Sequence, residues 1–155
     1  MPPVKVDGIE EMKALVGREI GPTDWREVTQ ADVDDFARLS GDDQWIHVDP
    51  ERSERESPFG GTVAHGNLTL SLIDGMRKQL VESTGFALGV NYGWNKVRFP
   101  APVPTGSRVR ARAEAVAVDE VGGGWFQIVQ RFTVEVEGAE KPACVAESVG
   151  RALPA

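Results

Sequence analysis

Residues 109–136 read VRARAEAVAVDEVGGGWFQIVQRFTVEV. Before and after the central glycines, apolar and polar side chains alternate, and a period of two is typical of strands with one buried face. Gly122, Gly123 and Gly124 separate the two alternating segments and suit a hairpin connection. We therefore predict two antiparallel strands, over about 109–118 and 125–136.

The segment at 66–83, GNLTLSLIDGMRKQLVES, has a different period. Its large apolar residues recur at spacings of three and four, as in a helix covered on several sides. They are Leu68, Leu72, Ile73, Met76 and Leu80. We predict a long helix over 66–83.

The remaining chain supplies smaller elements. We predict further strands over 86–99 and 143–152, and short helices over about 8–16 and 30–40. Thr29 is a suitable N-cap for the second short helix, and Gly41 is suited to end it. The polar region 42–63 is expected to be a long loop with at most one helical turn.

A sheet with one apolar face needs a cover, and the long helix is the only large partner that the chain offers. The predicted fold is therefore α+β, with an antiparallel sheet wrapped around a long central helix, an arrangement called the hotdog fold. The length of 155 residues suits a single domain spanning 1–155.

Composition excludes several classes of protein. Seventeen basic against 24 acidic residues give a net charge of −7, which disfavours a general nucleic-acid binder. The one cysteine, Cys144, excludes an intrachain disulfide and a cysteine-only zinc site. No apolar run is long enough for a membrane span, and the N-terminus lacks the apolar core of a signal peptide. We expect a cytoplasmic protein with no nucleic-acid or membrane partner.

The chain has two histidines. His47 lies in the segment at 40–50, SGDDQWIHVDP, and His65 lies at the start of the long helix. Asp42 and His47 form a carboxylate–imidazole pair that can share a water molecule and act as acid and base. Gln44 can hold either partner or a substrate carbonyl. His65 and Gly66 begin the long helix, whose free N–H groups suit a developing negative oxygen. This set suits addition or removal of water beside a carbonyl.

Each of these residues also has an ordinary structural interpretation. Asp42 can be a turn residue, His47 and Asp49 a surface pair, and His65 a packing or capping residue. His47, Asp49 and His65 are also possible metal ligands, although their spacing matches no strong metal signature. A Ser or Cys nucleophile is disfavoured, because no Gly-x-Ser-x-Gly occurs and Cys144 falls in a predicted strand.

The motif Gly-Asp-x-Gln-x-x-His-x-Asp at 41–49, followed by FGGTVAHG at 59–66, resembles the signature of the MaoC-like dehydratases. That family includes the (R)-specific enoyl-CoA hydratases. NYGWNKVRFPAPVP at 91–104 and KPACVAES at 141–148 are similar to its nodulation protein N subgroup. Three positions depart from common family residues: Gln44 stands where Asn is frequent, Trp45 where Pro is, and Asn67 where Met is.

The resemblance implies a homodimer that adds water to a trans-2-enoyl thioester, giving an (R)-3-hydroxyacyl thioester. Asp42 and His47 take the roles of the catalytic dyad, and the Gly66 N–H binds the thioester oxygen. No metal and no cofactor is implied.

The substrate is expected to be a thioester of coenzyme A or of acyl carrier protein. Gln44 and His65 are expected to contact it, and Lys96 or Arg98 is the candidate for a phosphate contact. Arg110 and Arg112 are expected to be ordinary solvated residues on the outer sheet face.

Two other functions remain open. An acyl-CoA thioesterase would direct water at the carbonyl carbon instead of the β-carbon. A non-catalytic acyl-thioester binding protein would keep the pocket without turnover.

Overall fold

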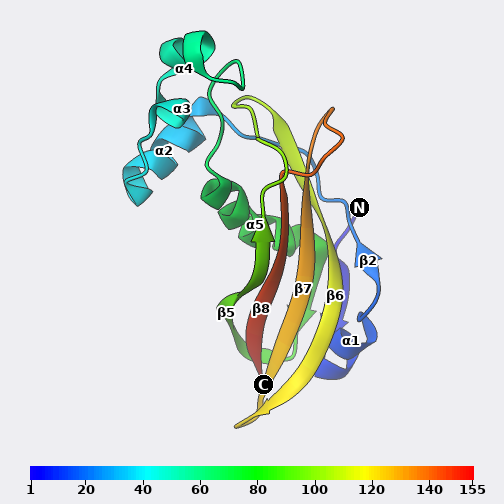
Figure 1. Ribbon diagram of the computed structural model, residues 1–155. Helices are drawn as coiled ribbons and strands as arrows, with labels where there is room; N and C mark the ends of the chain where they lie inside the picture. Colours follow the sequence, from blue (N-terminus) through cyan, green and yellow to red (C-terminus); the bar gives the residue numbers. More distant parts are fainter.

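The computed structural model describes residues 1–155 (Figure 1). None of its helices is both long enough and apolar enough to cross a membrane. In chain order the elements are β1 (Val4–Asp7), α1 (Gly8–Ala14), β2 (Glu19–Ile20), β3 (Arg26–Glu27), α2 (Gln30–Ser40), α3 (Trp45–Val48), α4 (Pro50–Glu56), α5 (Gly66–Leu80), β4 (Val81–Thr84), β5 (Phe86–Arg98), β6 (Arg108–Gly122), β7 (Trp125–Val136) and β8 (Cys144–Pro154).

The main sheet has the strand order β2-β6-β7-β8-β5, with β3 also paired to β6, and every pairing in it is antiparallel. Val109 pairs with Val136 at one end of the β6–β7 hairpin and Gly122 with Trp125 at the other, as the alternation predicts. The backbone at Gly122, Gly123 and Gly124 has positive φ, a conformation that residues other than glycine adopt only with strain.

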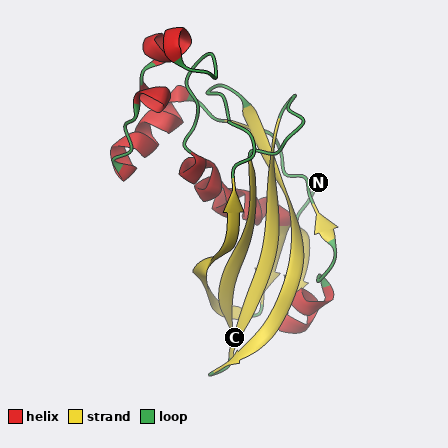
Figure 2. Cartoon of the chain, viewed as in Figure 1, coloured by secondary structure: helices red, strands yellow, loops and turns green.

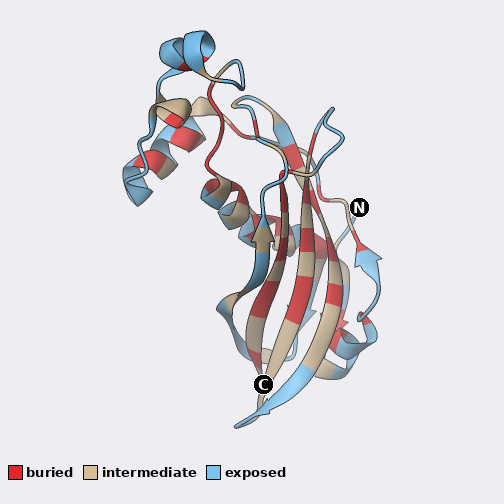
Figure 3. Ribbon diagram, in the orientation of Figure 1, coloured by how far each residue is buried: buried red, intermediate tan, exposed pale blue.

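Helix α5 lies across one face of the curved sheet (Figure 1), which confirms the predicted hotdog arrangement. Buried and less buried residues alternate along β6 and β7 (Figure 3), because successive side chains point to opposite faces. The core joins apolar residues of the helix and of the inner sheet face: Leu68, Ile73, Met76, Leu80, Val109, Ala111, Ala113, Phe132, Val134, Cys144 and Ala146.

Helix α5 is shorter than predicted, because it ends at Leu80 and not at residue 83. Residues Val81–Thr84 form β4, which pairs in parallel with β1, and Val4 lies opposite Val81. The Thr84 hydroxyl donates a 2.9 Å hydrogen bond to the Asp7 carboxylate and ties the two strands together. Pairing with a segment 77 residues away in sequence therefore overrides the helical pattern at this end.

The expectation of a loop over 42–63 with at most one helical turn is wrong, because the region contains α3 and α4. Asp49 starts α4 by accepting a 3.0 Å hydrogen bond from the Arg52 N–H, and Pro50 occupies the first helical turn. Thr29 caps the start of α2 and Gly41 follows its last residue, as predicted. Helices α2, α3 and α4 form a group at one end of the sheet (Figure 2).

Candidate active site

Asp42 lies on the turn between α2 and α3. Gly41 ends α2 in the left-handed conformation, with φ of 82°. The turn is held by two hydrogen bonds: the Asp42 N–H donates to the Ser40 hydroxyl at 3.2 Å, and the Gln44 N–H donates to the Asp42 carboxylate at 3.5 Å. The Asp42 side chain is exposed, so its carboxylate is available to a ligand.

His47 lies in α3 and is buried, which excludes a surface pair with Asp49. Its Nδ1 is 2.6 Å from the carbonyl oxygen of Val63. A carbonyl only accepts, so Nδ1 carries the proton and donates it. In the neutral ring, the other nitrogen, Nε2, has a lone pair and can accept a hydrogen bond from water.

His65 immediately precedes α5 and is also buried. Its Nε2 donates to the main-chain oxygen of Asp42 at 2.8 Å. Its ring stacks on that of His47 with the ring centroids 3.8 Å apart. The Phe36 ring is tilted relative to the His65 ring, with the centroids 4.9 Å apart. His65 therefore positions both members of the proposed dyad, one through the backbone and one through ring packing.

One side-chain nitrogen or carboxylate oxygen from each of Asp42, His47 and His65 lies within 4.8 Å of the other two. The structure thus brings together the carboxylate and the imidazole that the motif predicts. The His65 Nδ1 is buried without a hydrogen-bond partner, so by distance and donor type the three residues also suit a metal ion. Asp49 is not part of this cluster, because its carboxylate caps α4.

Gly66 lies at the N-terminus of α5, where free N–H groups and the helix dipole create a positive electrostatic potential. The first intrahelical bond of α5 runs from the Thr69 N–H to the His65 carbonyl, and no side chain caps the helix. The N–H groups of Gly66 and Asn67 are therefore free, and the helix dipole adds to their attraction for a negative oxygen. A Cβ at position 66 would lie 2.8 Å from Cε2 of Phe99, so a side chain there would require the exposed Phe99 ring or the helix start to shift.

Gln30 organises the site, although the sequence gives no signal for it beyond a polar residue in the first turn of α2. Its Nε2 donates to the main-chain oxygen of His47 at 2.8 Å, and its Oε1 accepts from the Thr62 hydroxyl at 2.7 Å. Gln30 thus fastens α3 and the segment before α5 to α2.

The candidate phosphate contacts, Lys96 and Arg98, lie exposed on β5 beside an irregularity between Trp94 and Val97. Arg98 donates to the Val97 carbonyl at 2.8 Å.

Arg110 and Arg112 are not the ordinary solvated residues that were predicted. Both are only partly exposed, and they bind Glu135 at 2.6 and 2.9 Å. Burial raises the pKa of Glu135, but the hydrogen bonds and charges of the two arginines outweigh it and hold the pKa below its ordinary value.

A protein-family model described as MaoC like domain matches residues 11–137. The 3-hydroxyacyl-thioester dehydratase Z of Mycobacterium tuberculosis strain H37Rv is 50% identical over 145 residues, which are 94% of this chain and 95% of that protein. Nodulation protein N of Rhizobium leguminosarum bv. viciae is 42% identical over 142 residues, covering 89% of this chain and 86% of that protein. The solved structure of the (R)-hydratase from A. caviae involved in PHA biosynthesis matches with a TM-score of 0.67 and 25% identity, covering 90% of this chain and 96% of that chain.

Proposed function

The chain belongs to the MaoC-like domain family, and from this premise we propose that it is an (R)-specific enoyl-thioester hydratase. It adds water to a trans-2-enoyl thioester and, in reverse, dehydrates an (R)-3-hydroxyacyl thioester. The carrying observation is the cluster of Asp42, His47 and His65 within 4.8 Å, beside the free N–H groups of α5. The names of the relatives, a 3-hydroxyacyl-thioester dehydratase and an (R)-hydratase, support the same chemistry.

The chain's own groups can perform each step. The His47 Nε2 accepts a hydrogen bond from a water molecule, and the Asp42 carboxylate takes its other proton as the oxygen attacks the β-carbon. Negative charge then develops on the thioester oxygen, where the Gly66 N–H and the helix dipole stabilise it. The α-carbon takes up a proton delivered through the dyad, so that one water molecule has been added across the double bond.

The substrate carrier is coenzyme A or acyl carrier protein in this proposal. Gln44 contacts the substrate carbonyl, and Lys96 or Arg98 contacts a phosphate of the carrier. The protein acts as a single domain and as a homodimer. The free edge of β5 is the surface for the second copy, because β5 pairs only with β8 and exposes Leu88 and Val90.

The test is the loss of enoyl absorbance with crotonyl-CoA and with a longer trans-2-enoyl-CoA, while free thiol is followed in parallel. We expect loss of the double bond without thiol release, and an (R)-configured product. Asp42→Asn and His47→Gln should each lower turnover at least about 100-fold, the lower end of general acid–base contributions. Asp43→Asn is the matched control, because it removes the same charge from the adjacent exposed position.

Near-normal turnover in a folded Asp42→Asn protein would exclude the proposed dyad. Thiol release without loss of the double bond would establish the thioesterase alternative. Tight binding of acyl-CoA with neither reaction would identify a binding protein.

A further inference from the structure

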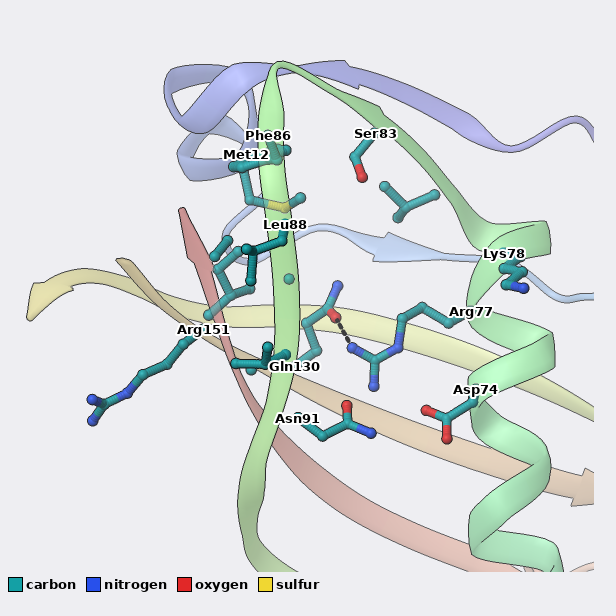
Figure 4. A pocket seen from close by; sticks show the side chains of 16 residues that line it. Met12, Asp74, Arg77, Lys78, Ser83, Phe86, Leu88, Asn91, Gln130 and Arg151 are labelled. Carbon is teal, nitrogen blue, oxygen red and sulfur yellow. Dashed lines mark hydrogen bonds between the residues drawn. The ribbon is translucent and has the colours of Figure 1, made fainter. Parts of the chain in front are cut away.

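The cavity in Figure 4, of about 430 Å³, lies between the second half of α5 and the strands β5, β7 and β8. Leu88 and Val90 line it, and both belong to the β5 edge where the proposed homodimer receives its second copy. The cavity is therefore part of that subunit interface. Neither Asp42 nor His47 lines it, so the contacts that hold the dyad lie elsewhere, where α2, α3 and the start of α5 meet.

Ser40 is the last residue of α2, and its hydroxyl group makes two hydrogen bonds. It donates its proton to the Phe36 carbonyl one turn earlier, at 2.7 Å, and its oxygen accepts the Asp42 N–H at 3.2 Å. A hydroxyl has one proton and two lone pairs, so both bonds can form together. Ser40 thus connects the last turn of α2 to the backbone of the residue that we propose takes a proton from water.

The ending of α2 explains why the Asp42 N–H needs this partner. Gly41 is left-handed, and its N–H donates to the Ala37 carbonyl at 2.9 Å, which is the helix ending with a single return bond. In the ending with two return bonds, the N–H of the following residue also bonds a helix carbonyl. In this chain that N–H belongs to Asp42, and it bonds the Ser40 hydroxyl instead. The direction in which the chain leaves α2 therefore depends on one side chain.

Asp42 is held on both sides through its main chain. Ser40 binds its N–H, and the His65 Nε2 donates to its carbonyl oxygen at 2.8 Å. The carboxylate is exposed, and the hydrogen bond that it accepts from the Gln44 N–H is long, at 3.5 Å. The position of the carboxylate is therefore set mainly by where the main chain is fixed. Without the Ser40 contact, the bond to His65 would be a single point about which the turn can rotate.

We propose that Ser40 is a positioning residue for the hydration reaction. By fixing the Asp42 N–H, it keeps the Asp42 carboxylate close enough to His47 for one water molecule to contact both. This inference rests on the proposed function, because it gives Ser40 a role in the geometry of the dyad. The rate depends steeply on that geometry, since a displacement of ~1 Å can cost ~100-fold.

Ser40→Ala removes the hydroxyl at an exposed helix end, where alanine is well tolerated. We expect kcat in the enoyl absorbance assay to fall at least about fivefold while KM changes by less than about twofold, because the contact orients a group that acts in the transition state. Ser40→Thr keeps the hydroxyl and should restore kcat to within about twofold of that of the unsubstituted protein. Ser57→Ala is the matched control and should leave kcat unchanged. The Ser57 hydroxyl accepts the Phe59 N–H at 3.1 Å at the end of α4, two residues on, as Ser40 does for Asp42.

Hydrogen exchange of the Asp42 amide, followed by NMR, tests the contact without using activity. Loss of the acceptor should speed this exchange at least about fivefold in Ser40→Ala, and not in Ser40→Thr or Ser57→Ala. Circular dichroism checks the fold of each variant.

The proposal is overturned if folded Ser40→Ala keeps its kcat, if its KM rises while kcat is unchanged, if Ser57→Ala loses as much kcat, or if the Asp42 amide exchanges no faster in Ser40→Ala. If the unsubstituted protein does not remove the enoyl absorbance, the proposed function fails and this role fails with it. The exchange of the Asp42 amide then reports separately whether Ser40 holds the N–H.

Discussion

Replacing Gly66 by alanine tests the contact between the start of α5 and Phe99. The added Cβ would lie 2.8 Å from Cε2 and 2.9 Å from Cδ2 of the ring. Favourable carbon–carbon contacts begin near 3.5 Å, so the ring or the helix start must move by about 0.7 Å. The free N–H groups that would receive the thioester oxygen lie at this point of the helix.

Two opposing effects set the stability of Gly66→Ala. Overpacking costs about 1–3 kcal/mol, whereas alanine gains about 0.4–1 kcal/mol by restricting the unfolded chain. We expect a net loss of about 1–2 kcal/mol in the free energy of unfolding, which lowers Tm by about 2–8 °C for a chain of this size. Misplacement of a catalytic group by ~1 Å can cost ~100-fold, so kcat/KM should fall at least about tenfold. Thermal melting and the enoyl absorbance assay measure the two effects.

Gly75→Ala is the matched control on the same helix. A Cβ at position 75 would have no atom of a neighbouring element within 4 Å. The substitution should stabilise the protein by up to about 1 kcal/mol and leave kcat/KM unchanged. In the Phe99→Leu background, Gly66→Ala should cost less stability and less activity than it does alone. Unchanged Tm and kcat/KM in Gly66→Ala, or an equal loss of activity in Gly75→Ala, would refute the argument from the Phe99 contact.

Three further predictions follow from individual contacts. Gln30→Ala leaves the His47 carbonyl without its 2.8 Å donor, so it should lower stability by about 1–3 kcal/mol and lower kcat; unchanged melting and kinetics would count against this bridge. Burial raises the pKa of the Cys144 thiol from 9.0 to about 11, so between these pH values the folded chain keeps a proton that the unfolded chain loses. The free energy of unfolding should therefore be unaffected by this thiol below pH 9 and decline by about 2 kcal/mol as the pH rises towards 11. Urea unfolding at pH 8 and pH 10.5 should show a smaller decline in Cys144→Ala; equal declines would contradict the assignment. Incubation with a chelator should leave hydratase activity intact, because the dyad and backbone N–H groups suffice. Inhibition reversed by added zinc would instead support the metal-site interpretation, with Asp42, His47 and His65 as the candidate ligands.

Much of the architecture follows from patterns that are local in the sequence. The alternation over 109–136 predicts β6, β7 and their glycine turn, because a strand with one buried face needs apolar residues at every second position. The spacing of Leu68, Ile73 and Met76 predicts α5, because a helix with a buried face needs apolar residues that recur about every three or four positions. The same local reading failed at Val81–Thr84 and over 42–63, where strand pairing and short capped helices depend on partners that periodicity does not reveal.

By itself, the sequence predicted the fold class, because hydrophobic periods are local features of the chain. It also singled out Asp42, His47 and Gly66 as candidates, through the motif at 41–66 and its resemblance to the MaoC-like dehydratases. Only the tertiary structure decided how these residues are held. The stacking of His47 on His65, the hydrogen bonds that assign their protons, and the bridge from Gln30 each join segments that are distant in sequence. Such contacts depend on how the helix packs against the sheet, and no local pattern records that packing.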